Sequence, residues 1–152
     1  MEKREKIYEG KAKILYQTDN PGILIQYFKD DATAFNAQKR GTIVNKGIVN
    51  NKVSEVLFKL VEGEGVRTHF LERISDREML VKRLQILPLE VIMRNRVAGT
   101  MAKRYGLEEW IVLKQPIIEF SYKKDELGDP MVSIPHILAL GWARPGSVTR
   151  RF

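Results

Sequence analysis

The sequence predicts an α+β protein built mainly from antiparallel sheet, and three features lead to this prediction. Short runs rich in Ile, Leu, Val and Tyr follow one another along the chain with few helical segments between them, which favours antiparallel over doubly wound parallel sheet. One segment changes to helical periodicity. At 152 residues without cysteine, the chain is long enough to bury a core without disulfide bonds.

The first expected elements are two strands, residues 12–18 and 22–28, separated by the strong turn sequence Asp-Asn-Pro-Gly. Residues 30–36 follow, with the sequence Asp-Asp-Ala-Thr-Ala-Phe-Asn. Such a segment can hold a polar ligand, but Asp and Asn also form turns by bonding to their own backbone. The residues themselves favour the turn, so we expect a loop here.

Residues 45–62 predict a helix that ends at Gly63. Asn45 can cap it, and the first amides of the helix can equally receive an anion. Apolar residues recur on one face, which we expect to point toward the core; they are Val49, Val53, Val56, Leu57, Leu60 and Val61.

The second half of the chain predicts further strands over residues 66–74, 78–86, 89–94 and 117–122. A short helix is expected to begin near Ala98 and to end at Gly106. We expect one domain over residues 1–84 and the beginning of a second over 85–152. From Gly141 onward the sequence has neither helical nor strand periodicity, as in a disordered tail or a chain that should continue.

The charge pattern bears on the class of partner. The net charge is +7, but it is scattered and contains no run of five or six like charges. Small anionic substrates explain such lysines at least as well as nucleic acid, so we expect no nucleic-acid partner. The sequence has neither the ~20-residue apolar stretch of a membrane helix nor the apolar core of a signal peptide. We therefore expect a cytoplasmic protein with no membrane partner.

Two segments could bind phosphate. Gly10 stands beside Lys11 and Lys13, and a glycine turn with lysines suits a phosphate group, although a hairpin turn with solvated lysines has the same sequence. Arg94 precedes Gly99-Thr100 at the expected start of a helix. Guanidinium, hydroxyl and helix amides together suit a phosphate monoester, while a solvated arginine near a helix cap remains the alternative.

A third segment, residues 123–130, places Lys123 near Asp125 and Asp129. Lysine beside carboxylates could meet nucleotide phosphates and Mg²⁺, but a polar turn is the default interpretation. The two histidines, His69 and His136, lack metal-ligand spacing, and each is interpreted as a buried or surface side chain.

Taken in order, these motifs resemble the SAICAR synthetase (phosphoribosylaminoimidazole-succinocarboxamide synthase) family. Its most specific stretch here is Leu-Pro-Leu-Glu-Val-Ile-Met-Arg at residues 87–94, followed by Val-Ala-Gly-Thr at 97–100. Tyr-Glu-Gly-Lys-Ala-Lys at 8–13, the 30–36 segment, Lys46-Gly47 with Asn50-Asn51, and Lys-Lys-Asp-Glu-Leu-Gly-Asp-Pro at 123–130 support it.

The resemblance implies a ligase that uses ATP and Mg²⁺ to join L-aspartate to carboxy-aminoimidazole ribonucleotide through an acyl phosphate. It implies that Lys11, Lys13 and Lys123 act on the ATP phosphates as catalytic lysines, that Arg94 and Thr100 hold the ribonucleotide phosphate, and that Asp129 stands near the metal. The ATP site it implies comprises Gly10, Lys11, Ala12, Lys13, Leu15, Leu24, Lys82 and Leu84.

The chain also departs from the family pattern. Thr100 replaces a serine, Trp110-Ile111 replaces a glycine-centred turn, and residues 132–135 replace a stretch with two carboxylates. The family pattern continues beyond Phe152 with a second acidic signature. The alternative function is therefore a truncated, catalytically incomplete nucleotide-binding fragment of this family. Homo-oligomers are a further expectation from the resemblance.

Overall fold

The structure, a computed structural model, describes residues 1–34 and 39–148. The chain divides into two compact units, Met1–Gln85 and Ile86–Phe152, which are described separately below. Every strand pair in the described ranges is antiparallel, so the predicted α+β class is confirmed. No helix among the described residues is long and apolar enough to cross a membrane.

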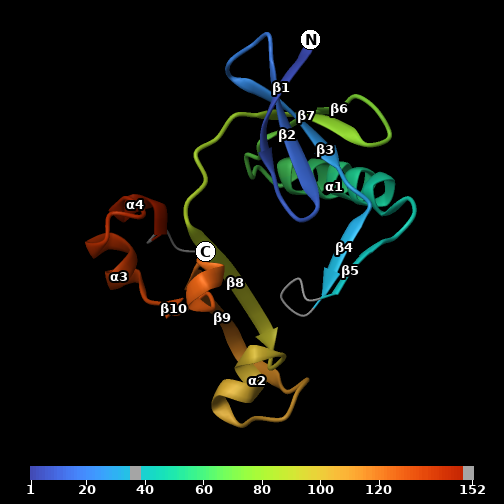
Figure 1. Ribbon diagram of the computed structural model, residues 1–152. Helices are drawn as coiled ribbons and strands as arrows, with labels where there is room; N and C mark the ends of the chain where they lie inside the picture. The colour runs from blue at the N-terminus through green and yellow to red at the C-terminus, as the bar shows by residue number, and fades with distance from the viewer. Residues whose placement is uncertain (35–38, 149–152) are drawn as a thin grey trace. The chain divides into compact units, whose positions relative to one another are not determined.

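The first unit is built on a five-stranded sheet with the order β1-β2-β3-β7-β6 (Figure 1). Its strands are β1 Lys3–Glu9, β2 Lys13–Thr18, β3 Ile23–Phe28, β6 Phe70–Arg73 and β7 Glu78–Lys82. The expected strand pair joined by the Asp-Asn-Pro-Gly turn is confirmed as β2 and β3. The turn forms because the Thr18 hydroxyl donates to the Asn20 and Ile23 carbonyls, each at 2.9 Å.

The core of this unit lies on one face of the sheet. Leu24 and Val81 are directly paired across β3 and β7, and alternation along each strand brings the next apolar residues to the same face. Partly buried Leu15 and Phe58 pack against this core. Its buried members are Leu24, Phe28, Phe70, Met79 and Val81.

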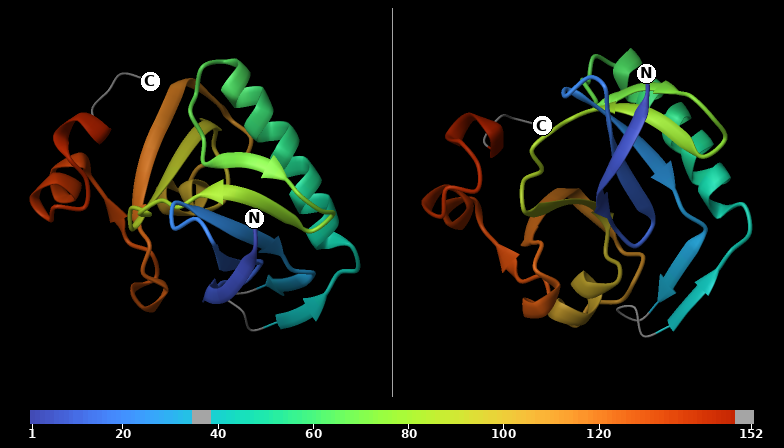
Figure 2. Two further views of the ribbon diagram at one scale, coloured as in Figure 1. Left: turned by 90° about the horizontal axis from the view of Figure 1, so that it is seen from above. Right: turned by 45° about the horizontal axis from the view of Figure 1, so that its top comes forward.

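The loop prediction for residues 30–36 is wrong for its first part. Asp31–Ala34 form β4, which pairs with β5, Lys39–Thr42, as a separate two-stranded ribbon (Figure 2). Strand pairing with β5 supplies the backbone partners that a turn would have found locally. Phe35 and Asn36 lie outside the described residues.

Helix α1, Lys46–Gly63, confirms the predicted helix, but its start is capped differently than expected. Asn45 makes no side-chain cap and has a left-handed φ of 65°. Instead the Asp30 carboxylate accepts from the Gly47 amide at 2.8 Å and from the Asn45 amide at 3.2 Å. Arg77 donates to both oxygens of the same carboxylate, at 2.6 and 2.9 Å. The anion at this helix start is therefore a side chain of the protein itself.

Gly47 explains how closely α1 approaches the sheet. A Cβ placed on Gly47 would lie 2.3 Å from the carbonyl oxygen of Phe28, a distance that no side chain can tolerate. One turn later the buried Asn51 amide nitrogen donates to the carbonyls of Ser75, Asp76 and Glu78. These two residues hold the first half of the helix against the chain that enters β7.

The predicted core face of α1 is wrong. Val49, Val53, Val56, Leu57, Leu60 and Val61 are all exposed, from 37% to 64%. The side of the helix that faces the sheet carries Gly47, Asn51 and Phe58. Gly47 permits close approach to the sheet, and the Asn51 amide donates to three backbone carbonyls there. Helical periodicity alone predicted that the six apolar residues, and not these three, would face the core.

The second unit is a three-stranded sheet with the order β10-β9-β8. Strand β8, Leu89–Arg96, pairs with the long β9, Val112–Tyr122, from Leu89–Tyr122 to Arg96–Val112. Helix α2, Thr100–Tyr105, follows β8 and ends at the left-handed Gly106, as predicted. Strand β10 is Met131–Val132, and η1, Asp125–Leu127, lies between β9 and β10.

The segment after β10 is more ordered than the sequence indicated. Helix α3, Ile134–Ala139, begins with a capping box between Ser133 and His136, and α4 is Pro145–Val148. The Trp142 ring stacks on Tyr122 of β9 at 4.2 Å. The expectation of an unstructured tail is therefore wrong for residues 141–148, because an aromatic pair and the buried Ile137 anchor this segment to β9.

Candidate functional site

The turn between β1 and β2 carries the first group of predicted site residues. The Gly10 amide donates to the Lys13 carbonyl at 2.8 Å, and the Ala12 carbonyl accepts from the Lys29 amide at 2.9 Å. The Tyr8 hydroxyl would lie 3.0 Å from a Cβ on Gly10, so the ring covers the glycine. The hairpin is thereby fixed, with Lys11 and Lys13 exposed.

A salt-bridge cluster holds this turn in place. Glu9 accepts from Lys6 and Lys29, each at 2.8 Å, and Lys29 first and Lys6 second lower the pKa of Glu9 to about 2. Glu9 is thus ionised at neutral pH, and it forms ion pairs with both of these lysines.

The apolar residues predicted to neighbour the adenine lie in the same unit. Leu15 is partly buried against the core, whereas Leu24 is a core residue with 6% exposure. Leu84 is 61% exposed in the segment after β7. Within the described ranges the Leu84 backbone makes no hydrogen bond. Its amide and carbonyl can therefore form hydrogen bonds with the edge of a ligand ring.

His69, which the sequence indicated only as a buried or surface side chain, lies next to Lys82 of the predicted ATP site. Its carbonyl accepts from the Lys82 amide at 2.7 Å, and its ring packs edge-on against Phe58 of α1 with centroids 5.0 Å apart. Burial lowers the pKa of His69, and the charges of Lys13 and then Lys82 lower it further. Burial is therefore the largest cause of the lowered pKa of this ring.

In the second unit, the structure brings Arg94 and Thr100 together. The Arg94 guanidinium donates to the Thr100 hydroxyl at 3.2 Å and to the Ala98 carbonyl at 3.3 Å. Its Nε donates to Glu119 at 2.6 Å. These bonds use three of the five N–H groups of arginine, and the remaining two, on the terminal nitrogens, can bind an oxyanion in a forked geometry.

Glu119 is a second residue that the sequence analysis missed. It lies on β9, and its side chain, only 9% exposed, pairs with both Arg94 and Arg104 of α2. A nearly buried carboxylate between two guanidinium groups fixes the orientation of Arg94. A lone acid between Ile118 and Phe120 in an apolar strand was the signal that could have found it.

The loop after β9 holds the remaining predicted residues. The Lys123 amide donates to the Pro88 carbonyl at 2.9 Å, and its side chain is exposed. Asp129 has a left-handed φ of 48° and accepts from the Lys124 amide at 2.7 Å. The carboxylate thus stabilises its own loop.

These residues do not by themselves fit a magnesium ion. Mg²⁺ requires near-octahedral coordination by oxygen, and one Asp129 oxygen is already bonded to the backbone. Across residues 1–34 and 39–148, no three His, Cys, Asp or Glu side chains gather at one point. Asp129 as a metal ligand stays a prediction.

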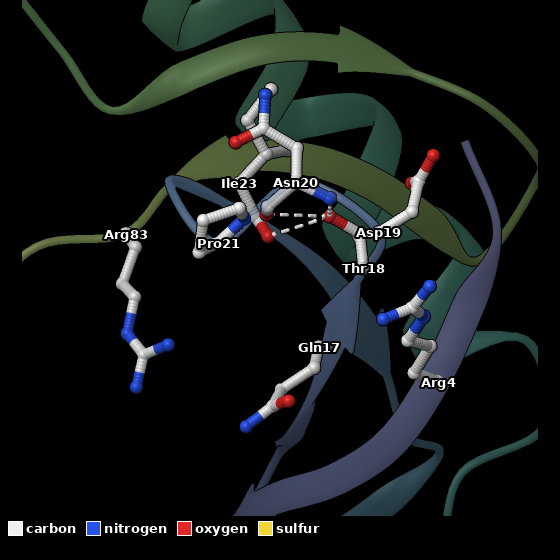
Figure 3. A pocket seen from close by; sticks show the side chains of 8 residues that line it. All are labelled: Arg4, Gln17, Thr18, Asp19, Asn20, Pro21, Ile23 and Arg83. Atoms are coloured by element: carbon white, nitrogen blue, oxygen red, sulfur yellow. Dashed lines mark hydrogen bonds between the residues drawn. The ribbon is translucent and has the colours of Figure 1, made fainter.

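A small cavity of about 150 Å³ lies beside the β2–β3 turn (Figure 3). It contains none of the predicted site residues. The Arg4 and Arg83 side chains border it, and Gln17 lies between them. The Arg83 amide donates to the Gly22 carbonyl at 2.8 Å, so the turn fixes the start of the segment that carries Leu84.

Comparison with known proteins places these features in a family. The SAICAR synthetase family model matches residues 6–150. Phosphoribosylaminoimidazole-succinocarboxamide synthase from Magnetococcus marinus is 56% identical over 144 residues, which is 95% of this chain and 60% of the relative. The enzyme from Thermoanaerobacter sp. is 60% identical, covering 92% of this chain and 60% of the relative.

Solved structures agree. The crystal structure of phosphoribosylaminoimidazole-succinocarboxamide synthase from Ehrlichia chaffeensis has a TM-score of 0.90 at 50% identity, covering 93% of this chain and 60% of that one. A SAICAR synthetase in complex with ADP has a TM-score of 0.85 at 44% identity, covering 90% and 58%. The chain spans about 60% of the length of such relatives, and it belongs to the SAICAR synthetase family.

Proposed function

We propose that this chain carries the nucleotide-binding and ribonucleotide-phosphate-binding part of an ATP-dependent ligase of purine biosynthesis. The observation that carries the proposal is the SAICAR synthetase solved with ADP, whose similarity covers 90% of this chain at 44% identity. The substrates we assign are ATP, carboxy-aminoimidazole ribonucleotide and L-aspartate.

The reaction that we propose has two steps. A carboxylate oxygen of the ribonucleotide base attacks the γ-phosphorus of ATP, which releases ADP and leaves an acyl phosphate. The amine of aspartate then attacks the acyl carbon, phosphate leaves, and the amine loses a proton. Because both steps crowd negative charge, cations and a fixed geometry contribute most of the catalysis.

In the first unit, we assign the ATP phosphates to Lys11 and Lys13. Both side chains are exposed on a hairpin held rigid by the Gly10 hydrogen bond and the Glu9 ion pairs, which limits the entropy lost when they bind phosphate. The unbonded backbone of Leu84 supports contacts to the adenine edge. Lys123 of the second unit is assigned to the phosphates as well.

In the second unit, we assign the ribonucleotide phosphate to Arg94 and Thr100. The two groups are hydrogen-bonded to each other, and Glu119 orients the guanidinium. Thr100 keeps the hydroxyl that a serine would supply. The proposal rests on this preorganised pair, which needs no rearrangement to present two N–H groups to an oxyanion.

Binding of each substrate by variants of the whole chain tests the assignments. Arg94→Ala should weaken the ribonucleotide by about 10- to 100-fold, because charge-assisted hydrogen bonds are lost, and should leave ADP unchanged. Arg104→Ala is the matched control, since it removes the other partner of Glu119. Equal losses in both variants would show that the effect passes through Glu119 and would refute direct contact by Arg94.

Product formation separates the ligase from the alternative, a nucleotide-binding fragment of the same family. The chain is incubated with all three substrates and magnesium, and ADP and the succinocarboxamide product are measured by chromatography. Product that depends on Arg94 and Lys13 supports the ligase. Binding of ADP without product supports the fragment.

A further inference from the structure

The small cavity beside the β2–β3 turn is lined by cationic and amide side chains that the proposed reaction does not use. Arg4 comes from β1, Gln17 from β2, and Arg83 from the segment after β7. Figure 3 shows the two arginines on either side of the cavity, with Gln17 between them. Three separate segments of the first unit therefore supply the polar side chains of one cavity.

The pairing of the strands explains why these side chains meet. The first residues of β1 pair with the end of β2, which brings Arg4 next to Gln17. The Arg83 amide donates to the Gly22 carbonyl at 2.8 Å, so the start of the segment after β7 is held against the β2–β3 turn. The cavity is therefore bordered by backbone that the sheet and the turn keep in place.

Gln17 lies at the margin of the hydrophobic core. It pairs directly with Leu24 of that core, so both side chains lie on the same face of the sheet. Gln17 is half-buried, and within the part of the chain that the structure describes its side-chain amide has no hydrogen-bond partner. Because it is costly to withdraw a polar group from water without a partner, this amide favours a polar ligand in the cavity.

The two arginines lack a counter-charge. Neither Arg4 nor Arg83 forms an ion pair with any residue of the described ranges. Asp19 is the only acid among the described residues that line the cavity, and its Oδ1 accepts from the Glu2 amide at 3.1 Å. Figure 3 shows the Asp19 carboxylate directed away from Gln17. Two guanidinium groups and one amide thus face the cavity without an anion of the protein to bind.

The size of the cavity limits what it can hold. Its volume is about 150 Å³, well below the roughly 300 Å³ at which pockets for larger organic ligands begin. A nucleotide is too large, whereas an ion of a few heavy atoms fits. Guanidinium groups bind phosphate and carboxylate oxygens through paired N–H groups, and a glutamine amide can donate another N–H. Two positive charges favour an anion that carries two negative charges.

We propose that Arg4, Arg83 and Gln17 bind a small oxyanion with two negative charges, either inorganic phosphate or a short dicarboxylate. The anion accepts hydrogen bonds from both guanidinium groups and from the Gln17 amide. None of the residues assigned to the ATP site lines the cavity, so this is a separate site. The inference therefore does not depend on the proposed function.

The experiment follows three side-chain signals of the whole chain by ¹⁵N NMR, the Gln17 amide and the Nε–H groups of Arg4 and Arg83. The chain is titrated with inorganic phosphate, with succinate and with sodium chloride at matched ionic strength. Phosphate, succinate or both should shift all three signals with a single dissociation constant, whereas chloride should give no saturable shift. The anion that saturates the signals identifies the ligand class. Because these signals report the cavity itself, phosphate bound at Lys13 or Arg94 does not interfere.

Variants then test the contacts. Arg4→Gln and Arg83→Gln should each weaken the saturating anion by roughly 10- to 100-fold, as measured by the Gln17 signal, because charge-assisted hydrogen bonds are lost. Arg67→Gln removes the same charge from an exposed side chain outside the cavity, and it should keep the affinity. Absence of saturable shifts with both anions, or an equal loss in all three variants, would refute the site.

Discussion

Single residues explain where the chain departs from simple sequence rules, and Asp30 is the clearest case. Its carboxylate caps α1 through two amides and pairs with Arg77 in a forked geometry. Arg77 first, and then the Gly47 amide, lower the pKa of Asp30 well below its ordinary value of 3.8. In the sequence, Asp30 resembles a residue that forms a local turn. In the structure it instead caps helix α1, which begins later in the chain.

The Asp30 cap predicts a specific acid sensitivity. Because the folded pKa lies below the unfolded value, the stabilisation is complete above about pH 4 and is lost as the pH falls toward the folded pKa. Asp30→Asn should lower the melting temperature at pH 7 and flatten the fall in stability below pH 4. Asp19→Asn, at an exposed turn, is the control; the same flattening in both variants would contradict the assignment.

Trp110 carries backbone strain that a glycine would relieve. Its φ is 73°, and its position is fixed because its amide donates to the Val97 carbonyl at 2.8 Å. A bulky residue in the left-handed region is strained, and the ring is 69% exposed, so it packs little. A glycine would adopt this φ without the strain, because it has no Cβ.

Trp110→Gly should stabilise the chain by about 1 kcal/mol, which is the relieved strain less the greater chain entropy of glycine. Trp110→Ala keeps the strain and should change stability little. Urea unfolding of the three proteins measures the difference. A glycine variant no more stable than the alanine variant would contradict the account.

At the scale of elements, the sequence predicted types better than orientations. The β2–β3 pair, α1 and α2 follow from turn residues, periodicity and the Gly106 stop, which are local signals. The orientation of α1 does not follow from local signals, because Gly47, Asn51 and Asp30 set it through contacts that span 17 to 27 positions in the chain. Such non-local packing commonly overrides a periodic pattern. Likewise β4 forms only because β5 pairs with it.

The orientation of α1 has a direct test. Phe58 packs on Phe70 and His69, so Phe58→Ala should destabilise the chain by about 2 kcal/mol, somewhat below the cost for a fully buried ring. Leu57→Ala, one residue away and 53% exposed, should cost less than about 0.5 kcal/mol. Chemical denaturation compares the two, and a larger loss for Leu57 would restore the orientation that periodicity predicted.

In the candidate site, too, the sequence predicted features that depend on local signals and missed those that depend on distant contacts. Gly10, Lys11 and Lys13 occupy the hairpin turn that their sequence indicates, and Arg94 meets Thr100 as their spacing suggested. Glu119 was missed because its place in the site depends on Arg94, a neighbour distant in the sequence. Spacing within one segment does not reveal such pairs.

At the scale of the whole molecule, two compact units each carry one group of phosphate-binding candidates. The first holds Lys11 and Lys13, and the second holds Arg94, Thr100 and Lys123. A ligase that joins an activated carboxylate to an amine needs both groups, since ATP and the ribonucleotide each present phosphates. The relatives, which extend well beyond the length of this chain, have both units and a further region.

The most direct test of the central claim, that this chain binds an adenine nucleotide through phosphate contacts, is calorimetric titration of the whole chain with ADP and with adenosine. We expect one ADP per chain, bound much more tightly than adenosine. ADP at a hundred times its dissociation constant should then add about 2.7 kcal/mol to the stability. Absence of saturable ADP binding, or equal affinity for adenosine, would contradict the account.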